Sequence, residues 1–194
     1  MTFSNILRIA ASSTFLFAMA GIATAQGPVV GANTTTSELA MTANVDTAVQ
    51  LNISTGAGGA TVTGSNATGL FAVNFGNING LGSGTPAAGV TVAIDGVDGA
   101  LYTTPINLTP VYSGFTTETA ALEVSQDGLG DITMTREGAT AGTTAEVSTG
   151  IPTPVAAGVA SGATVERFVG FYVARGEESG AKVSTLIYTV TVAL

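Results

Sequence analysis

Cysteine, histidine and tryptophan are all absent from this chain of 194 residues, and lysine and arginine together number five. The missing thiol and imidazole groups exclude a Ser-His-Asp triad, a cysteine nucleophile and a metal site built on these ligands. A pair of carboxylates could still hydrolyse a glycoside. The nearest such neighbours, Glu177 and Glu178, lie in a glycine-rich stretch without the aromatic side chains of a sugar cleft. We therefore expect neither an enzyme nor a bound cofactor.

Charge of either sign is scarce, and positive charge most of all. Thirteen acidic residues against five basic ones give a net charge of −8 at pH 7. Such a surface repels nucleic acid and anionic lipid, so we expect no nucleic-acid partner. Charged residues make up only 9% of the chain and the mean hydropathy is +0.47, both of which argue against disorder.

The first 25 residues have the pattern of a secretory signal peptide. Arg8 precedes an apolar run over 9–22, and Ala23-Thr24-Ala25 forms a small-residue cleavage site before Gln26. The alternative is a membrane anchor, but the run is shorter than the roughly 20 residues that a spanning helix needs. We expect cleavage, no membrane span afterwards, and a mature chain over 26–194. Export without cysteine favours a bacterial extracellular or cell-surface protein.

Every odd position from Leu39 to Ile53 is apolar or threonine, whereas the even positions are mostly polar or small. A period of two places one face of a strand in a core and the other in water. At about 3.3 Å per residue, a single strand of this length would reach roughly 50 Å, well beyond a typical strand. The segment is therefore either two strands joined by a bend or one strand that extends past its own domain.

The rest of the mature chain also predicts strands. Threonine and valine are abundant, and glycine-rich breaks such as Asn79-Gly80, Asp95-Gly96, Asp98-Gly99 and Asp127-Gly128 supply turn residues. The expected strands are 60–63, 70–75, 90–94, 100–103, 106–112, 120–125, 132–136, 144–147, 165–174 and 183–193. Stretches 80–89 and 138–162 are expected to be loops, the second with 144–147 as a weak strand. This spacing predicts an all-β, antiparallel sandwich over 46–194, with a barrel as the alternative.

The last two expected strands have the clearest alternation. On 165–174, Arg167 shares a face with three valines and a phenylalanine, and we expect its charged head to reach water near the strand start. We expect this strand to form a hairpin with the last one. On 183–193 one face carries a row of apolar and aromatic side chains: Leu186, Tyr188, Val190 and Val192.

Two expected turns carry pairs of carboxylates that could bind calcium: Asp95 with Asp98, and Asp127 with Asp131. Neither has the ligand spacing of a calcium loop, so hairpin turns are the favoured reading and no metal is expected. Four Asn-x-Ser/Thr glycosylation motifs also occur, at Asn33, Asn52, Asn66 and Asn107. Because the chain is rich in asparagine and threonine, most of these motifs are expected by chance.

The segment 26–45 is the candidate for assembly. In β-strand addition, an extended arm pairs with the open sheet edge of a neighbour while alternate side chains fill its pockets. The spacing of four residues fits that role: Leu39, Met41, Ala43 and Val45. The alternative is that these residues belong to the first strand of their own sandwich. A head-to-tail arm would build an open filament of identical copies rather than a closed dimer.

Three features carry a family resemblance: the signal segment, Phe71-Ala-Val-Asn-Phe75-Gly76, and the closing segment Thr185-Leu-Ile-Tyr188-Thr-Val-Thr-Val192-Ala-Leu194. Together they resemble the exported bacterial β-sandwich subunits of the fimbrial and spore-coat-U-like type. The resemblance implies an Ig-like, Greek-key sandwich, export across the inner membrane and a structural role at the cell surface. No catalytic residues follow from it.

Two functions therefore compete. The first is a structural subunit of a surface filament, pilus-like fibre or coat that assembles by β-strand addition from 26–45. The second is a secreted, monomeric adhesin or binding module that recognises a glycan or a protein through loops 80–89 or 138–162.

Overall fold

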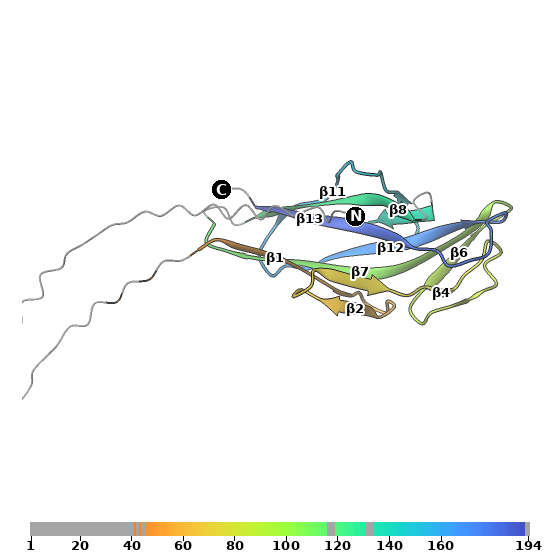
Figure 1. Cartoon of the computed structure of the whole chain (residues 1–194), viewed down its shortest axis with the longest axis horizontal. Coiled ribbons are helices and arrows are strands. Elements are labelled where there is room, and N and C mark those ends of the chain that lie inside the picture. Colours follow the sequence, from red (N-terminus) through yellow and green to blue (C-terminus); the bar gives the residue numbers. More distant parts are fainter. Residues whose placement is uncertain (1–40, 42, 44–45, 116–118, 131–133, 193–194) are drawn as a thin grey trace, which may run out of the picture. The chain divides into compact units, whose positions relative to one another are not determined.

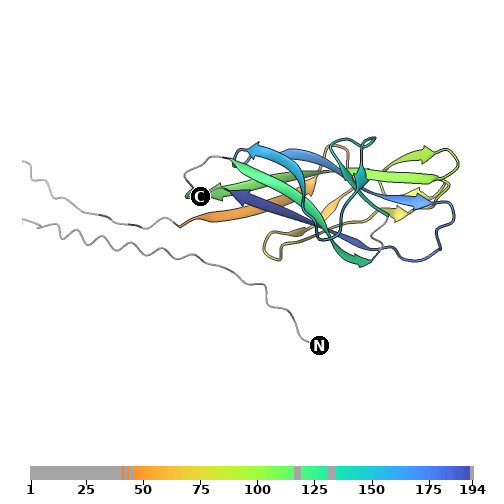
Figure 2. The same ribbon diagram turned by 90° about the horizontal axis from the view of Figure 1, so that it is seen from above.

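The fold is antiparallel and all-β, as expected. A computed structural model describes residues 41, 43, 46–115, 119–130 and 134–192. The chain divides into two units, Met1–Ala43 and Asn44–Leu194, and the second is the one described here. Its described residues form thirteen strands and no α-helix, seen from two directions in Figure 1 and Figure 2.

In chain order the strands are β1 (Ala48–Thr55), β2 (Val62–Ser65), β3 (Leu70–Val73), β4 (Gly76–Asn77), β5 (Thr85–Pro86), β6 (Thr91–Asp95), β7 (Gly99–Ser113), β8 (Ala120–Gly130), β9 (Thr135–Gly138), β10 (Ala145–Glu146), β11 (Thr153–Val159), β12 (Val165–Ala174) and β13 (Ser184–Val192).

These strands form two principal sheets. One has six strands in the order β1-β7-β12-β9-β10, with β6 also paired to β7. The other has three strands in the order β11-β8-β13. Two small hairpins, β2-β3 and β4-β5, complete the described strands. All the strand ladders named here are antiparallel.

Side chains from both principal sheets share one hydrophobic core. Strand β7 places Tyr102, Ile106 and Leu108 on one face, toward the core, and its middle part from Tyr102 to Ile106 is buried on both faces. They meet Leu122 of β8 and Val169 of β12 in the same cluster. The period of two predicted from the sequence is therefore the reason that the sheets have an apolar face to pack.

Strand β7 corrects the expectation of two strands, 100–103 and 106–112, separated at Pro105. Proline lacks an N–H and should interrupt a central strand. Strand β6 pairs with β7 only as far as Thr103, and β1 begins pairing at Ile106. The Pro105 carbonyl accepts a hydrogen bond from the Gly56 N–H at 3.1 Å, so the backbone polar groups of residue 105 point to the side of β7 where the β6 ladder has ended and the β1 ladder has not yet begun. The N–H that proline lacks would therefore not have paired with either strand.

The stretch 138–162 is also more regular than expected, because it contains β11 as well as the weak strand that became β10. β11 includes Pro154. It is an end strand of its sheet, where a proline can leave its missing N–H on the open side. Its pairing with β8 shifts register on either side of Ala156.

Asp127-Gly128 is not a hairpin turn but part of β8. Ser184 pairs with Gly130 and Leu186 with Gln126, so three residues of β8 face one of β13 in a bulge. Gly128 has φ +78°, and the Asp127 carboxylate accepts a hydrogen bond from the Leu129 N–H at 2.9 Å. A glycine with positive φ serves a bulge as well as a turn, and the sequence does not distinguish the two.

Asp95-Gly96 and Asp98-Gly99 together form a single turn, between β6 and β7. Asp95 pairs with Gly99, and the Asp98 N–H donates to the Asp95 carbonyl at 2.9 Å. The expectation of a turn here is confirmed, although the loop has three residues rather than two.

Candidate assembly edge at strands β1 and β13

Strand β13 lies at one end of the three-stranded sheet and pairs there with β8. Its even-numbered side chains are half-buried and its odd-numbered ones exposed. Leu186, Tyr188 and Val190 pack against the hydrophobic core, and Val192 lies on the same face. The other face carries threonines together with Ile187, which is exposed. The residues singled out in the closing segment thus form the inward face of an end strand.

The expected hairpin between the last two strands is wrong. β12 belongs to the six-stranded sheet and β13 to the three-stranded one, so the linker 175–183 carries the chain from one sheet to the other. A strand with one apolar face can pack against the shared core from either sheet. The alternation in the sequence predicts which face is apolar but not which sheet the strand joins.

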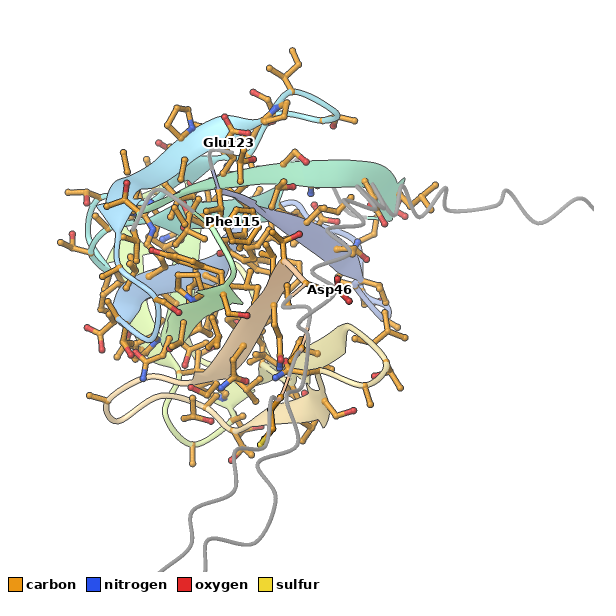
Figure 3. All side chains as sticks on the ribbon, turned by 90° about the vertical axis from the view of Figure 1, so that its left-hand side faces the viewer. Asp46, Phe115 and Glu123 are labelled. Atoms are coloured by element: carbon orange, nitrogen blue, oxygen red, sulfur yellow. The ribbon has the colours of Figure 1, made fainter. Side chains whose placement is uncertain are left out.

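Strand β1 is the corresponding end strand of the six-stranded sheet, where it pairs with β7. Leu51 and Ile53 pack against the core, whereas Val49 is 46% exposed. β1 and β13 approach one another without sharing a ladder. Figure 3 looks onto the end at which β1 begins, marked by Asp46. Two end strands from different sheets therefore meet on this side.

The amphipathic segment over 39–53 is one strand only in its second half. β1 begins at Ala48, and Met41 and Ala43 lie outside any strand. Met41 is 85% exposed. Leu39 and Val45 lie outside the described residues. Among the described residues of this segment, strand structure therefore begins only at Ala48.

Beneath β13 lies a charged cluster that the sequence reading missed. The Arg167 guanidinium on β12 donates to the Glu137 carboxylate on β9, with Nε–Oε1 at 2.6 Å and Nη2–Oε2 at 2.8 Å. The Tyr188 hydroxyl lies 3.5 Å from Glu137 Oε1. The Arg167 and Glu137 side chains are 13% and 5% exposed. We expected Arg167 to reach water; instead its head stays on the apolar face and pairs there.

This cluster perturbs the titration of its members. The hydrogen bonds with Glu137 raise the pKa of Arg167, although desolvation opposes this effect. Burial first, and then the charge of Glu137, raise the pKa of Tyr188 well above its ordinary value. Tyr188 is therefore neutral at ordinary pH and contributes a phenol, not a phenolate. A signal was present in the sequence: an arginine among valines on one strand face requires an acidic partner.

The aspartates considered as alternative calcium ligands do not converge among the described residues. Asp95 and Asp98 share the β6–β7 turn, Asp127 is in the β8 bulge, and Asp131 lies outside the described residues. No group of three acidic, histidine or cysteine side chains suited to a metal ion occurs in the described part of the chain. Glu177, considered above with Glu178 as a carboxylate pair for glycoside hydrolysis, forms an ion pair with Lys182.

Among the described residues, no helix has the length and apolarity to cross a membrane.

Comparison of the chain with family models, with curated proteins and with solved structures gives no match.

Proposed function

We propose that this protein is a structural subunit of an extracellular surface filament, pilus-like fibre or coat, and that copies join by β-strand addition. The arm over 26–45 would supply the added strand after removal of the signal peptide 1–25. Leu39, Met41, Ala43 and Val45 would point into the neighbour. The open side of β13 would receive it, next to β1.

The observation that carries this proposal is the pair of end strands β1 and β13, which approach each other from different sheets. An end strand presents unpaired N–H and C=O groups, and proteins normally shield or use them. Here both strands offer apolar inward faces through Leu51, Ile53, Leu186 and Val190. An added strand on the open edge of β13 would gain backbone hydrogen bonds from β13 and apolar contacts with the side chains that β1 and β13 turn inward.

We also propose that the two sheets form an Ig-like, Greek-key sandwich. Two antiparallel sheets with a shared core, connected by chain crossings between layers, support an Ig-like, Greek-key sandwich. The crossings from β7 to β8 and from β12 to β13 are of this kind. An incomplete sandwich of this type, lacking one strand at the β1–β13 side, would be completed by the next copy.

The test is electron microscopy and gel filtration of the exported mature protein. We expect filaments from the unaltered chain and soluble monomers after deletion of 26–45. Met41→Asp should abolish assembly because it places a charge in an apolar pocket, whereas Thr42→Asp, on the opposite alternate face of the sequence pattern, should assemble normally. Filaments that persist after the deletion would disprove strand addition by this arm.

The second candidate, a secreted monomeric binding module, is supported by a different observation. The outward face of the six-stranded sheet carries an open cavity with charged, aromatic and apolar lining. A module of this kind would run as a single monomer and bind one ligand saturably.

A further inference from the structure

The cavity lies where β6, β7, β9 and β12 meet, on the face of the sheet turned away from the core. Its volume is about 350 Å³. Ala93, Leu101 and Tyr172 form one row across three strands, because Leu101 pairs with Ala93 on one side and with Tyr172 on the other. Their alternate neighbours Tyr102 and Val173 are buried in the core. The row gives the cavity an apolar and aromatic floor.

Arg136 provides a positioned cationic donor at the β9 side. Its guanidinium carbon lies 5.4 Å from the centroid of the Tyr172 ring, and its Nη1 donates to the Thr135 carbonyl at 3.0 Å. Glu146, directly opposite on β10, approaches the same group at 3.9 Å. These contacts hold the guanidinium in place before any ligand arrives, which reduces the entropy lost on binding.

Asp95 supplies hydrogen-bond acceptors to the cavity. Its carboxylate lies across the cavity and accepts a long hydrogen bond, 3.4 Å, from the Tyr172 hydroxyl. Thr144 also lines the cavity, but its Oγ1 is fully buried and therefore out of reach of a ligand there.

The chemistry of this lining selects a ligand class. One carboxylate, one guanidinium and the Tyr172 hydroxyl surround an apolar floor, so the ligand must both donate and accept hydrogen bonds and also present an apolar face. A sugar ring does this, with its hydroxyls at the edge and its C–H groups on one face. The net charge of −8 disfavours an anion. The volume is near the lower end for ligand pockets, which suits a single ring.

We propose that this cavity binds a neutral hexose unit of a glycan, with its ring on Tyr172 and Leu101 and its hydroxyls on Asp95 and Arg136. The proposal gives the second candidate function a site and does not rest on strand addition. Because the cavity is open, the remaining units of an oligosaccharide would extend into solvent.

Saturation-transfer NMR on the purified exported chain tests this, with glucose, galactose, mannose and N-acetylglucosamine as probes and glucuronic acid as the anionic comparison. We expect saturable binding of at least one neutral sugar. Asp95→Asn should weaken it by about tenfold, the scale of a lost charged hydrogen bond. Asp98→Asn is the matched control, since Asp98 lies in the same turn but does not line the cavity, and it should leave affinity unchanged.

The proposal is overturned if no neutral sugar binds, if glucuronic acid alone binds, or if Asp95→Asn and Asp98→Asn act equally. None of these outcomes affects filament formation, which is scored separately by microscopy.

Discussion

Arg167 and Glu137 form a two-point ion pair on the inward face of the six-stranded sheet, joining β12 to β9. The two side chains lie diagonally across the ladder in which Val169 pairs with Glu137. Paired in this way, neither charge is left alone among apolar neighbours. The pair is therefore a point at which the stability of the sheet can be tested.

We expect Glu137→Gln to lower the free energy of unfolding by about 3 kcal/mol, because the Arg167 charge then stays largely buried without its counter-charge. Replacing both residues by leucine should recover most of that loss, since no buried charge remains. Urea unfolding of the single and double variants measures both effects. A double variant no more stable than Glu137→Gln would show that the single loss does not come from an unpaired charge.

Tyr188 predicts a loss of stability in alkaline solution. Its pKa in the folded protein is raised well above the ordinary value of 10.0, mainly by burial. Below pH 10 the hydroxyl is protonated in both folded and unfolded states, so its contribution to stability is constant. Above pH 10 the unfolded chain releases the proton first, and stability falls as pH rises toward the folded pKa.

Tyr188→Phe should therefore flatten the decline of unfolding free energy above pH 10, while stability at neutral pH changes little. Denaturant unfolding at a series of alkaline pH values, with tyrosinate absorbance recorded in parallel, measures the difference. An identical slope in both proteins would mean that Tyr188 does not control this transition.

Thr104 connects two loops to the centre of β7. Its Oγ1 accepts a hydrogen bond from the Ala60 N–H at 2.7 Å and donates to the Gly89 carbonyl at 3.0 Å, and the residue is fully buried. Thr104→Val keeps the shape but leaves both backbone groups without their partner. We expect a loss of about 2–3 kcal/mol.

Thr104→Ser is the matched control because it retains the hydroxyl. It should lose less stability than the valine variant, even though it removes a buried methyl group. Thermal or urea unfolding of the pair gives the comparison. If serine were the more damaging replacement, packing rather than hydrogen bonding would dominate at this position.

Gly170 on β12 has no room for a side chain. A Cβ there would lie 2.1 Å from the Tyr102 carbonyl oxygen on β7. Gly170→Ala should push the two central strands apart and lower stability by about 1–3 kcal/mol. Gly142→Ala, at a glycine with open space around it, should stay within about 0.5 kcal/mol of the unaltered protein. Equal stability of the two variants would refute the close approach.

Local pattern was a good guide to strands and to their faces. The strand over 165–174 has the bounds of β12, and the closing strand differs from β13 by one residue at each end. Alternation also placed Leu186, Tyr188 and Val190 on a single face. These properties depend on residues two apart in one segment, so they are visible without knowledge of the partner strand.

Pairing was not visible in the same way. The sequence places a strand break at Pro105, yet β7 continues because two different partners, β6 and β1, leave a gap there. It also suggests a terminal hairpin, whereas β12 and β13 lie in different sheets. Which strand lies beside which is decided by long-range packing, and the local residues are compatible with several arrangements.

By itself, the sequence indicated the all-β fold of the described residues and excluded cysteine- or histidine-based chemistry, because composition and a two-residue period act locally. Only the tertiary structure decided that Arg167 meets Glu137, that Asp127-Gly128 is a bulge, and that Asp95, Arg136 and Tyr172 line one cavity. Each of these brings together residues from different strands or depends on the register between strands. Such proximity follows from how apolar faces of separate segments pack, which no single segment specifies.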